Sequence, residues 1–158
     1  TMELFKSGKV VAAGAQDPES DLLGQYKLAW NILRVQGTPC LVREFHVQNV
    51  VGNVKFPFEL DVEAFYSDHS STSIYNPSIF SGVQYHMKHR YPQFKKMVLV
   101  LFSSGNMLLS GGRSIQMITD AFNAMKNEIG KYRVNRDTAL RLVAQQAVLG
   151  KAYNAKQL

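Results

Sequence analysis

The stretch MVLVLFSSGNMLLSGGR (residues 97–113) decides most of the fold, because it places two apolar runs on either side of the turn-forming segment 103–106. This pattern predicts a β-hairpin. An ordinary half-buried hairpin alternates apolar and polar side chains, whereas both faces of the first run are apolar here. Either both faces are buried, or one is held open for a flat apolar partner. The two faces carry Met97, Leu99 and Leu101 on one side and Val98, Val100 and Phe102 on the other.

A second hairpin of the same kind is predicted in residues 1–14, TMELFKSGKVVAAG. Phe5 and Phe102 lie 97 positions apart, each precedes a turn with serine and glycine, and three apolar residues follow both turns. A further match pairs AWNIL (residues 29–33) with AFNAM (residues 121–125) at an offset of 92. Two matches in the same order predict a duplicated subdomain, because a period of roughly ninety residues is too long for a solenoid repeat.

The remaining segments alternate between helical and extended patterns. Apolar residues at helical spacing predict helices from Asp17 to Val35 with Trp30 in the core, from Glu59 to Ser67, from Ser114 to Gly130 with Ile115 inward, and from Asn135 to Asn154. Alternating runs predict strands at residues 43–56, 73–77 and 80–89. Residues 86–96 are a predicted loop that is crowded with cations and aromatic side chains.

Composition and charge narrow the class of protein. The length of 158 residues suits one domain. The hydrophobic content of 46% excludes a disordered chain. Eighteen Lys and Arg against twelve Asp and Glu give a net charge of +6, which modestly favours a polyanionic partner such as nucleic acid. The single cysteine, Cys40, excludes an internal disulfide. No apolar run of about eighteen residues exists, so we expect no membrane partner.

Side-chain patterns typical of catalysis or metal binding are not found. His86 and His89 lie three residues apart, but no cysteine or carboxylate is spaced to complete a metal site with them. The acids between Glu59 and Asp68 are better explained by a solvated short helix than by acid–base catalysis. No Ser/His/Asp or Cys/His arrangement can be nominated. We therefore predict that the protein is not an enzyme and holds neither a metal nor a cofactor.

Several motifs in one order resemble the TATA-binding protein family of archaeal and eukaryotic transcription. The similar segments are VQNVVG (47–52), VKFP (54–57), YNP (75–77), FSG (80–82), LFSSG (101–105) and LSG (109–111). The resemblance implies an α+β fold: a saddle with a curved antiparallel β-sheet, helices on its convex face and a duplicated subdomain. It divides the chain into the C-terminal half of a first repeat (1–41), a complete second repeat (42–133) and an additional C-terminal helix (134–158).

The resemblance also implies a function, namely a transcription initiation factor that binds and bends A·T-rich double-stranded DNA through the minor groove. An apolar sheet suits this groove, because the groove presents few distinguishing hydrogen-bond groups. Phenylalanine wedges would unstack base steps at a cost of a few kcal/mol per step, offset by the larger contact that bent DNA offers. The expected partners are therefore DNA and transcription initiation factors or the RNA polymerase machinery, and the expected location is the nucleus.

By the same resemblance, the residues that contact DNA come from both hairpins, from the strand before Pro57 and from the start of the strand predicted at 80–89. Phe80 and Phe102 would be the wedge pair of the second repeat, and Phe5 one wedge of the first. Asn49 is similar to the central amide that contacts acceptors on A·T base edges. The other implied contacts line the groove or meet phosphates: Val11, Val51, Val100, Leu108, Ser110, Ser7, Ser104, Lys9 and Arg113.

Several positions depart from the family's pattern. Ala13 and Ser110 stand where the family has a threonine, and His86 replaces a phosphate-binding arginine. Asn76 and Ser78 replace two acids that the family uses to dock transcription factor IIB. The first repeat is only half present, so binding by this chain alone is expected to be weak. These departures favour a divergent member from a large DNA virus, for which the location would be a cytoplasmic viral factory.

A hypothesis from a different class also fits the sequence. The saddle would then serve as a protein-interaction module without DNA binding, with its apolar face covered by a partner, by the additional helix or by a second copy of the chain. An exposed sheet edge favours such self-association. An RNA-binding α/β domain is a weaker third hypothesis, because the aromatic stacking signature expected there is absent.

Overall fold

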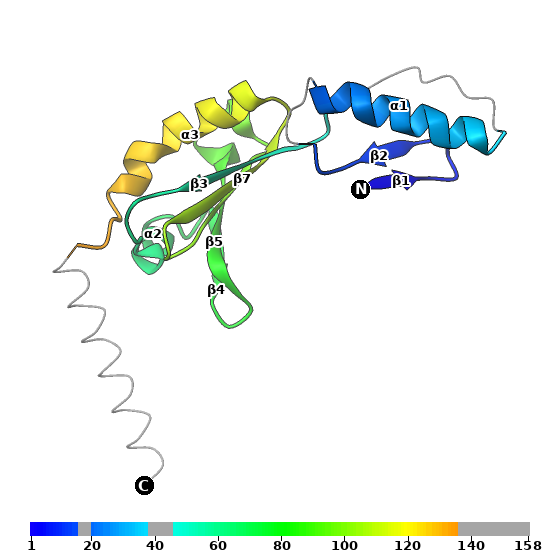
Figure 1. Cartoon of the computed structure of the whole chain (residues 1–158). Coiled ribbons are helices and arrows are strands. Elements are labelled where there is room, and N and C mark those ends of the chain that lie inside the picture. Colours follow the sequence, from blue (N-terminus) through cyan, green and yellow to red (C-terminus); the bar gives the residue numbers. More distant parts are fainter. Residues whose placement is uncertain (16–19, 38–45, 136–158) are drawn as a thin grey trace, which may run out of the picture. The chain divides into compact units, whose positions relative to one another are not determined.

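The computed structural model of the chain describes residues 1–15, 20–37 and 46–135. The chain divides into two compact units, Thr1–His46 and Val47–Leu158, which we call the N-terminal unit and the C-terminal unit. Most elements of both are labelled in Figure 1. The predicted helix start at Asp17 and the predicted helix over residues 135–154, apart from Asn135 itself, lie outside the described residues.

The N-terminal unit contains one hairpin and one helix. β1 (Met2–Leu4) and β2 (Val10–Ala12) pair antiparallel, and α1 (Ser20–Val35) lies beside them (Figure 1). The prediction that Trp30 belongs to the core is wrong, because the side chain is 39% exposed while its neighbour Ala29 is buried. Two strands of three residues offer too little apolar surface to cover a helix of 16 residues.

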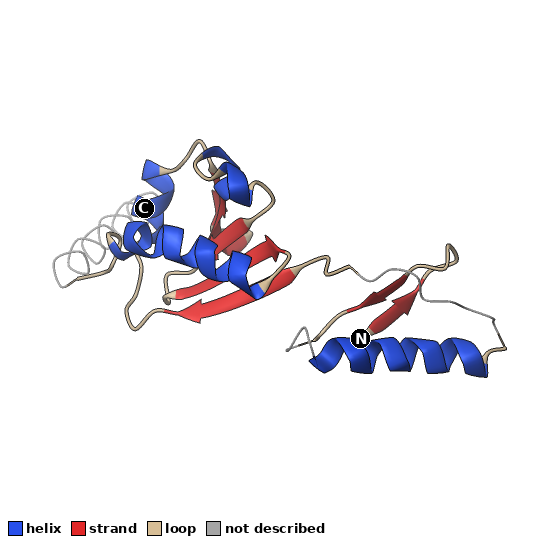
Figure 2. Ribbon diagram, turned by 90° about the horizontal axis from the view of Figure 1, so that it is seen from above, coloured by secondary structure: helices blue, strands red, loops and turns tan. Residues whose placement is uncertain are grey.

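The C-terminal unit is built on a five-stranded antiparallel sheet. The strand order is β3-β7-β6-β5-β4, with β3 at Val50–Lys55, β4 at Ser73–Asn76, β5 at Phe80–His86, β6 at Val98–Leu101 and β7 at Asn106–Gly112. α2 (Val62–Asp68) packs against β4 and β5, and α3 (Ile115–Gly130) packs against β3 and β7. Figure 2 shows α3 lying across the strands. Antiparallel strands with segregated helices confirm the α+β class.

Two predicted strands have different ends in the structure. The strand predicted at 43–56 begins at Val50, after the irregular residues 46–49, and its register shifts between Val50 and Gly52. The strand predicted at 80–89 ends at His86, where a short 3₁₀ helix (Met87–His89) buries Met87 completely. A second 3₁₀ helix, Pro92–Phe94, lies in the segment predicted as a loop. Burial of these apolar side chains fixes a connection that looked irregular in sequence.

The helices of this unit begin at capping side chains. α2 starts three residues later than predicted, because the Asp61 carboxylate accepts a hydrogen bond from the Ala64 N–H (2.9 Å). α3 starts where predicted, and the Ser114 hydroxyl accepts a hydrogen bond from the Met117 N–H (3.1 Å). Ile115 was expected on the buried face, but it is 57% exposed because it lies in the first turn, beyond the edge of the core.

The hydrophobic core lies between the sheet and the two helices. Met97, Leu99 and Leu101 point into it and are at most 1% exposed, so one of the two apolar faces of the hairpin is buried. α3 approaches the sheet closely because Gly52 and Gly112 have no side chains. A Cβ atom on these glycines would lie 2.4 Å and 2.7 Å, respectively, from side-chain atoms of Ile118.

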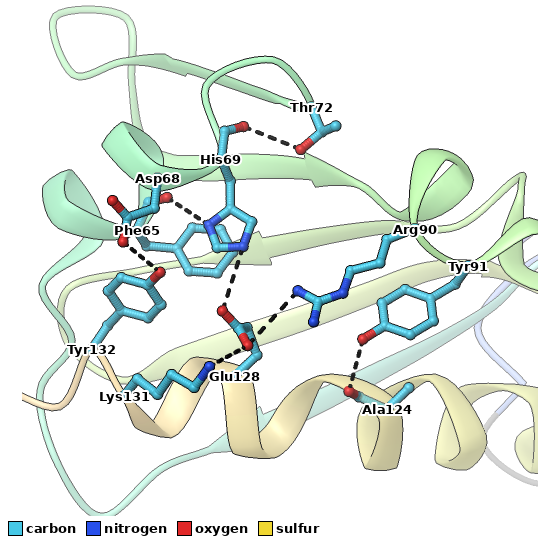
Figure 3. Close-up of polar contacts among 10 residues, drawn as sticks. All are labelled: Phe65, Asp68, His69, Thr72, Arg90, Tyr91, Ala124, Glu128, Lys131 and Tyr132. Atoms are coloured by element: carbon cyan, nitrogen blue, oxygen red, sulfur yellow. Dashed lines mark hydrogen bonds and ion pairs between the residues drawn. The ribbon is translucent and has the colours of Figure 1, made fainter.

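A polar cluster joins the end of α2 to the end of α3 (Figure 3). The His69 ring stacks on Phe65 at 4.4 Å, and its Nε2 lies 3.7 Å from a carboxylate oxygen of Glu128. Lys131 donates a hydrogen bond to Glu128 (2.8 Å), and the Arg90 guanidinium lies 3.7 Å from the same carboxylate. The Lys131 hydrogen bond and these charges lower the pKa of Glu128, although partial burial opposes the shift.

Two tyrosine hydroxyls complete the attachment of α3 (Figure 3). The Tyr132 hydroxyl donates to Asp68 Oδ2 (2.9 Å), and the Tyr91 hydroxyl donates to the Ala124 carbonyl (3.1 Å). Burial and the Asp68 carboxylate raise the pKa of Tyr132. The helices are thereby held on one face of the sheet, and no described helix of the C-terminal unit packs against the opposite face.

Candidate nucleic-acid interface

The face of the five-stranded sheet that points away from α2 and α3 is the candidate interface, and we call it the open face. Alternate residues of the strands reach it, as in β6, where Val98 and Val100 are half-buried while Leu99 and Leu101 are buried. All five strands contribute. The open face consists of Ile74, Phe80, Gln84, His86, Val98, Val100, Phe102, Leu108, Ser110, Val51 and Asn53.

A single row of side chains crosses the whole width of this face. The strand registers pair Ile74 with Gln84, Gln84 with Val100, Val100 with Leu108 and Leu108 with Asn53. The row contains three aliphatic side chains and two amides, and no charge. Val100 and Leu108 of the predicted set therefore lie directly opposite each other in the middle of the sheet.

Two phenylalanine rings meet at one end of the open face. Phe80 opens β5, Phe102 follows β6, and their ring centroids are 5.7 Å apart in an edge-to-face arrangement. Phe80 remains 42% exposed. The predicted wedge residues, 22 positions apart in the sequence, are therefore neighbours in space, although neither belongs to the buried core.

Asn49 lies at the opposite end of the sheet, just before β3. Its Oδ1 accepts a hydrogen bond from the Gly111 N–H (2.7 Å). Only glycine suits position 111, because its φ is +90° and a Cβ atom would fall 2.2 Å from the Lys96 carbonyl oxygen. The amide oxygen must face Gly111, since an N–H can only donate. What remains of the hydrogen-bonding capacity of Asn49 is its NH₂ group, a donor.

The polar residues of the predicted contact set lie at the two ends of the sheet and on its open face. Ser104 is in the hairpin turn, where its hydroxyl accepts a hydrogen bond from Asn106 Nδ2 (3.1 Å) and its carbonyl accepts one from Lys55 Nζ. Ser110 is on the open face opposite Val98, and Arg113 is exposed directly after β7. The Ser104 hydroxyl still has its own O–H to donate.

The distribution of charge was missed in the sequence and is clear once the strands are placed. Residues 69–119, which include β4 to β7 and their connections, contain no Asp or Glu, and neither do residues 46–58 around β3. The acids of the described C-terminal unit fall in residues 59–68, around α2, and in α3 at Asp120 and Glu128. A search of the sequence for long acid-free segments would have found this signal. Carboxylates are thus confined to the helix side.

The predicted contacts in the N-terminal unit occupy an equivalent turn. Phe5 is 48% exposed, Ser7 and Lys9 are exposed in the turn, and Val11 is half-buried in β2. The Phe5 N–H donates to the Lys9 carbonyl and the Gly8 N–H donates to the Phe5 carbonyl, both at 2.9 Å. The same two bonds, at the same length, close the turn that follows Phe102.

The register adds residues that the sequence did not single out. Ile74, Gln84 and Asn53 lie on the open face beside the predicted set. Pattern alone could not find them, because it does not show which residues of separate strands face each other. Within residues 1–15, 20–37 and 46–135, no group of three His, Cys, Asp or Glu residues is placed to hold a metal. No helix in these ranges has the length and apolarity needed to cross a membrane.

Comparison with known proteins finds one family. The family model described as "Transcription factor TFIID (or TATA-binding protein, TBP)" matches residues 44–132. TATA-box-binding protein 1 of Triticum aestivum is 35% identical over 135 residues, which cover 84% of this chain and 54% of that protein. The TATA-box-binding protein of Saccharomyces cerevisiae is 34% identical and is covered to 53%. The chain thus spans about half the length of the curated relatives it matches.

The fold is also shared with a solved structure. Methanococcus jannaschii TBP superposes with a TM-score of 0.65, covering 82% of this chain and 71% of that chain at 23% sequence identity. At this level of identity the likeness shows a common fold.

Proposed function

The chain belongs to the TATA-binding protein family, and we propose that it binds A·T-rich double-stranded DNA in the minor groove, bends it and serves in transcription initiation. The observation that carries this proposal is the open face, which spans five strands, is mainly apolar and, among the described residues, has no carboxylate. Negatively charged DNA would meet no repelling side chain there.

The middle of the open face suits the floor of a minor groove. We assign Val51, Val100 and Leu108 to contacts with sugars and base edges. Removal of aliphatic side chains from water is favourable, and these side chains need no hydrogen bonds, of which this groove offers few. The two amides of the central row, Gln84 and Asn53, supply adaptable polar contacts at either side.

The phenylalanine pair supplies the proposed bend. Phe80 and Phe102 project at one end of the face as two rings in contact, which suits insertion between base pairs from the minor-groove side. Partial unstacking costs a few kcal/mol per base step. This cost is offset because the bent duplex covers more of the apolar sheet. Phe5 is the proposed wedge of the N-terminal hairpin, whose turn has the same hydrogen bonds.

Asn49 supports the proposed preference for A·T base pairs. Its amide oxygen is occupied by Gly111, so the group presented to DNA is a donor. Both A·T and T·A pairs expose acceptors in the minor groove, at adenine N3 and thymine O2. A G·C pair instead adds the guanine amino group, a second donor that would face the Asn49 amide without a hydrogen bond.

Phosphate contacts are proposed for the polar residues around the face. Ser104 and Arg113 lie at opposite ends of the sheet. Ser7 and Lys9 take the corresponding roles in the N-terminal hairpin. Ser110, on the open face, and Val11 are assigned to the groove itself. The phosphate contacts position the duplex and carry little sequence information.

The repeat boundaries and the partners belong to the same proposal. Residues 1–41 would be the C-terminal half of a first repeat, residues 42–133 a second repeat and residues 134–158 an additional element. Transcription initiation factors or the RNA polymerase machinery would be the protein partners, in the nucleus. A viral origin stays a prediction from the departures at positions such as His86 and Asn76.

The test measures affinity and bending on an A·T-rich duplex, by fluorescence anisotropy and by energy transfer between dyes at the two ends. The variant with Phe80→Ala and Phe102→Ala should lose most of the bending, because no wedge remains in the C-terminal unit. Ile115→Ala is the matched control, since Ile115 is 57% exposed but belongs to α3 on the helix side. Unchanged bending in the double variant would contradict the proposal.

Light scattering over a range of protein concentrations, with and without the duplex, separates this function from the protein-interaction hypothesis. If the chain binds DNA, a complex forms only when the duplex is present, and its affinity falls steeply as the salt concentration rises. Self-association through the open face would instead appear without DNA, and the double phenylalanine variant would reduce it. That outcome would replace the proposed function with the interaction module.

A further inference from the structure

Gly82 in β5 lies directly beneath the two phenylalanine rings. A Cβ atom added to it would lie 2.8 Å from Phe80 Cε1, 2.8 Å from Val100 Cγ1 and 3.0 Å from Phe102 Cε1. The position is buried, although it is on the open side of the sheet, because the rings cover it. The space that a side chain would occupy at position 82 is therefore filled by three residues of the proposed DNA contact.

The need for glycine here is steric. The chain has five glycines with positive φ among its described residues, and Gly82 is not one of them, so its backbone is ordinary strand. At Gly105 and Gly111 the atom closest to an added methyl group would be a backbone carbonyl oxygen, at 2.2 Å in both cases. At Gly82 all three close atoms are the ends of side chains. A methyl group there would displace rings and leave the backbone where it is.

We propose that Gly82 is the positioning residue of the phenylalanine wedge. Because it has no side chain, both rings can lie over the strand at the same distance from the sheet and contact each other edge to face. The pair then meets DNA as one preformed wedge instead of two rings that must be ordered on binding. This inference rests on the proposed function for its effect on DNA, but the placement of the rings is a property of the free protein.

The substitution Gly82→Ala tests the placement in the free protein first. Nuclear Overhauser contacts between the ring protons of Phe80 and Phe102 should be present in the unmodified chain and lost or strongly weakened in the variant. Gly24→Ala is the matched control, because a Cβ at Gly24 meets nothing within 4 Å. Retention of the ring contacts in Gly82→Ala overturns the proposal, whatever the DNA experiments give.

The effect on DNA is tested with a double-mutant cycle. Gly82→Ala should lower affinity by about three- to tenfold, the worth of a well-placed aromatic pair, and should reduce the bend. In the background of Phe80→Ala with Phe102→Ala, the same substitution should have a much smaller effect on both quantities, because only the contact with Val100 remains. An equal loss in both backgrounds would show that position 82 acts on DNA without the rings, and would overturn the proposal.

The outcomes for the two proposals are distinguishable. If the unmodified chain neither binds nor bends an A·T-rich duplex, the proposed function fails, while the ring contacts in the free protein still decide the role of Gly82. If Gly82→Ala fails to fold, the triple variant decides, because removal of both rings leaves only the contact with Val100 and must restore folding. A triple variant that also fails to fold overturns the proposal.

Discussion

The two hairpins of this chain have the same turn and different surroundings. The turns after Phe5 and Phe102 are closed by the same pair of backbone hydrogen bonds, all at 2.9 Å, and the glycine in each has a φ of +81°. Phe5 is nevertheless 48% exposed beside a two-stranded ladder, whereas Phe102 is half-buried against Phe80 in a five-stranded sheet. The turn is thus fixed by its own residues, whereas the burial of its aromatic residue depends on the size of the sheet around it.

The helices that follow the hairpins repeat this contrast. Ala29 and Ala121, which match at the offset of 92, are both buried, so the small residue faces inward in each unit. Trp30 is 39% exposed, but the matching Phe122 packs against the core. The larger sheet of the C-terminal unit extends far enough to cover the second aromatic position.

The largest predicted difference between the hairpins is in stability. Met107 and Val10 occupy matching positions, but Met107 is completely buried and Val10 is only half-buried. Met107→Ala should lower the free energy of unfolding of the C-terminal unit by about 2–5 kcal/mol, whereas Val10→Ala should change that of the N-terminal unit by less than about 1 kcal/mol. Amide hydrogen exchange in β6 and β7 measures the change in the C-terminal unit.

Fluorescence of Trp30, the single tryptophan, during urea unfolding reports the N-terminal unit. Gly24→Ala, which meets no neighbour, controls for substitutions in this unit. Equal losses of unfolding free energy in the two units would contradict the prediction, because they would mean that the larger sheet does not bury its hairpin more effectively.

The next largest effect is expected at the glycines that end the two hairpins. Gly14 and Gly111 have similar φ values, +95° and +90°, but a Cβ at Gly14 would meet only Thr1 N at 4.0 Å, whereas one at Gly111 would meet the Lys96 oxygen at 2.2 Å. Gly14→Ala should cost about 1–2 kcal/mol from its left-handed backbone, and Gly111→Ala about 2–4 kcal/mol because crowding is added. Thermal unfolding of each unit measures both.

Gly111→Ala should also weaken DNA binding, because it disturbs the hydrogen bond that holds Asn49. Asn49→Ala is the matched variant, since it removes the amide without the backbone strain. If Gly111→Ala left both quantities unchanged, the crowding at this position would not affect stability and the Asn49 contact would not affect DNA affinity.

A smaller difference is predicted for the wedges on DNA. Phe102 is held by Phe80 over Gly82, whereas Phe5 has no ring contact among the described residues of its unit. Phe102→Ala should therefore weaken binding to an A·T-rich duplex by about 1–2 kcal/mol, roughly five- to thirtyfold, and Phe5→Ala by less. Anisotropy titrations at one fixed salt concentration give both values, and a larger loss for Phe5 would reverse the comparison.

The smallest effect concerns pH. Glu128 matches Gln36 at the offset of 92, so only the C-terminal unit carries a titrating group at this place. Because the pKa of Glu128 is lowered from 4.5, its contribution to stability is present above that pH and is lost as the pH falls through the lower value. Unfolding of the C-terminal unit between pH 6 and roughly pH 3 should lose part of its pH dependence in Glu128→Gln. An identical pH profile in that variant would contradict the assignment.

Much of the C-terminal unit could be predicted from sequence. The hairpin turn, the inward set Met97, Leu99 and Leu101, and α3 follow from alternation, helical spacing and turn residues, and the structure has them. The strand before Pro57 was predicted to begin too early, because an extended side-chain pattern continues through residues 46–49, which the structure shows outside β3. The resemblance supplied the candidate contacts, but not the row of residues that joins them.

The sequence alone is enough to predict the turns with their glycines, the alternation of side chains along each strand and the family to which the chain belongs. These depend on residues close together in the chain, or on motifs that can be compared directly. Only the tertiary structure decided that Val98, Val100 and Phe102 lie on an uncovered face, that Gly111 holds Asn49 and that Gly82 leaves room for two rings. Each of these depends on the register between strands that are distant in sequence, and a side-chain pattern does not contain that register.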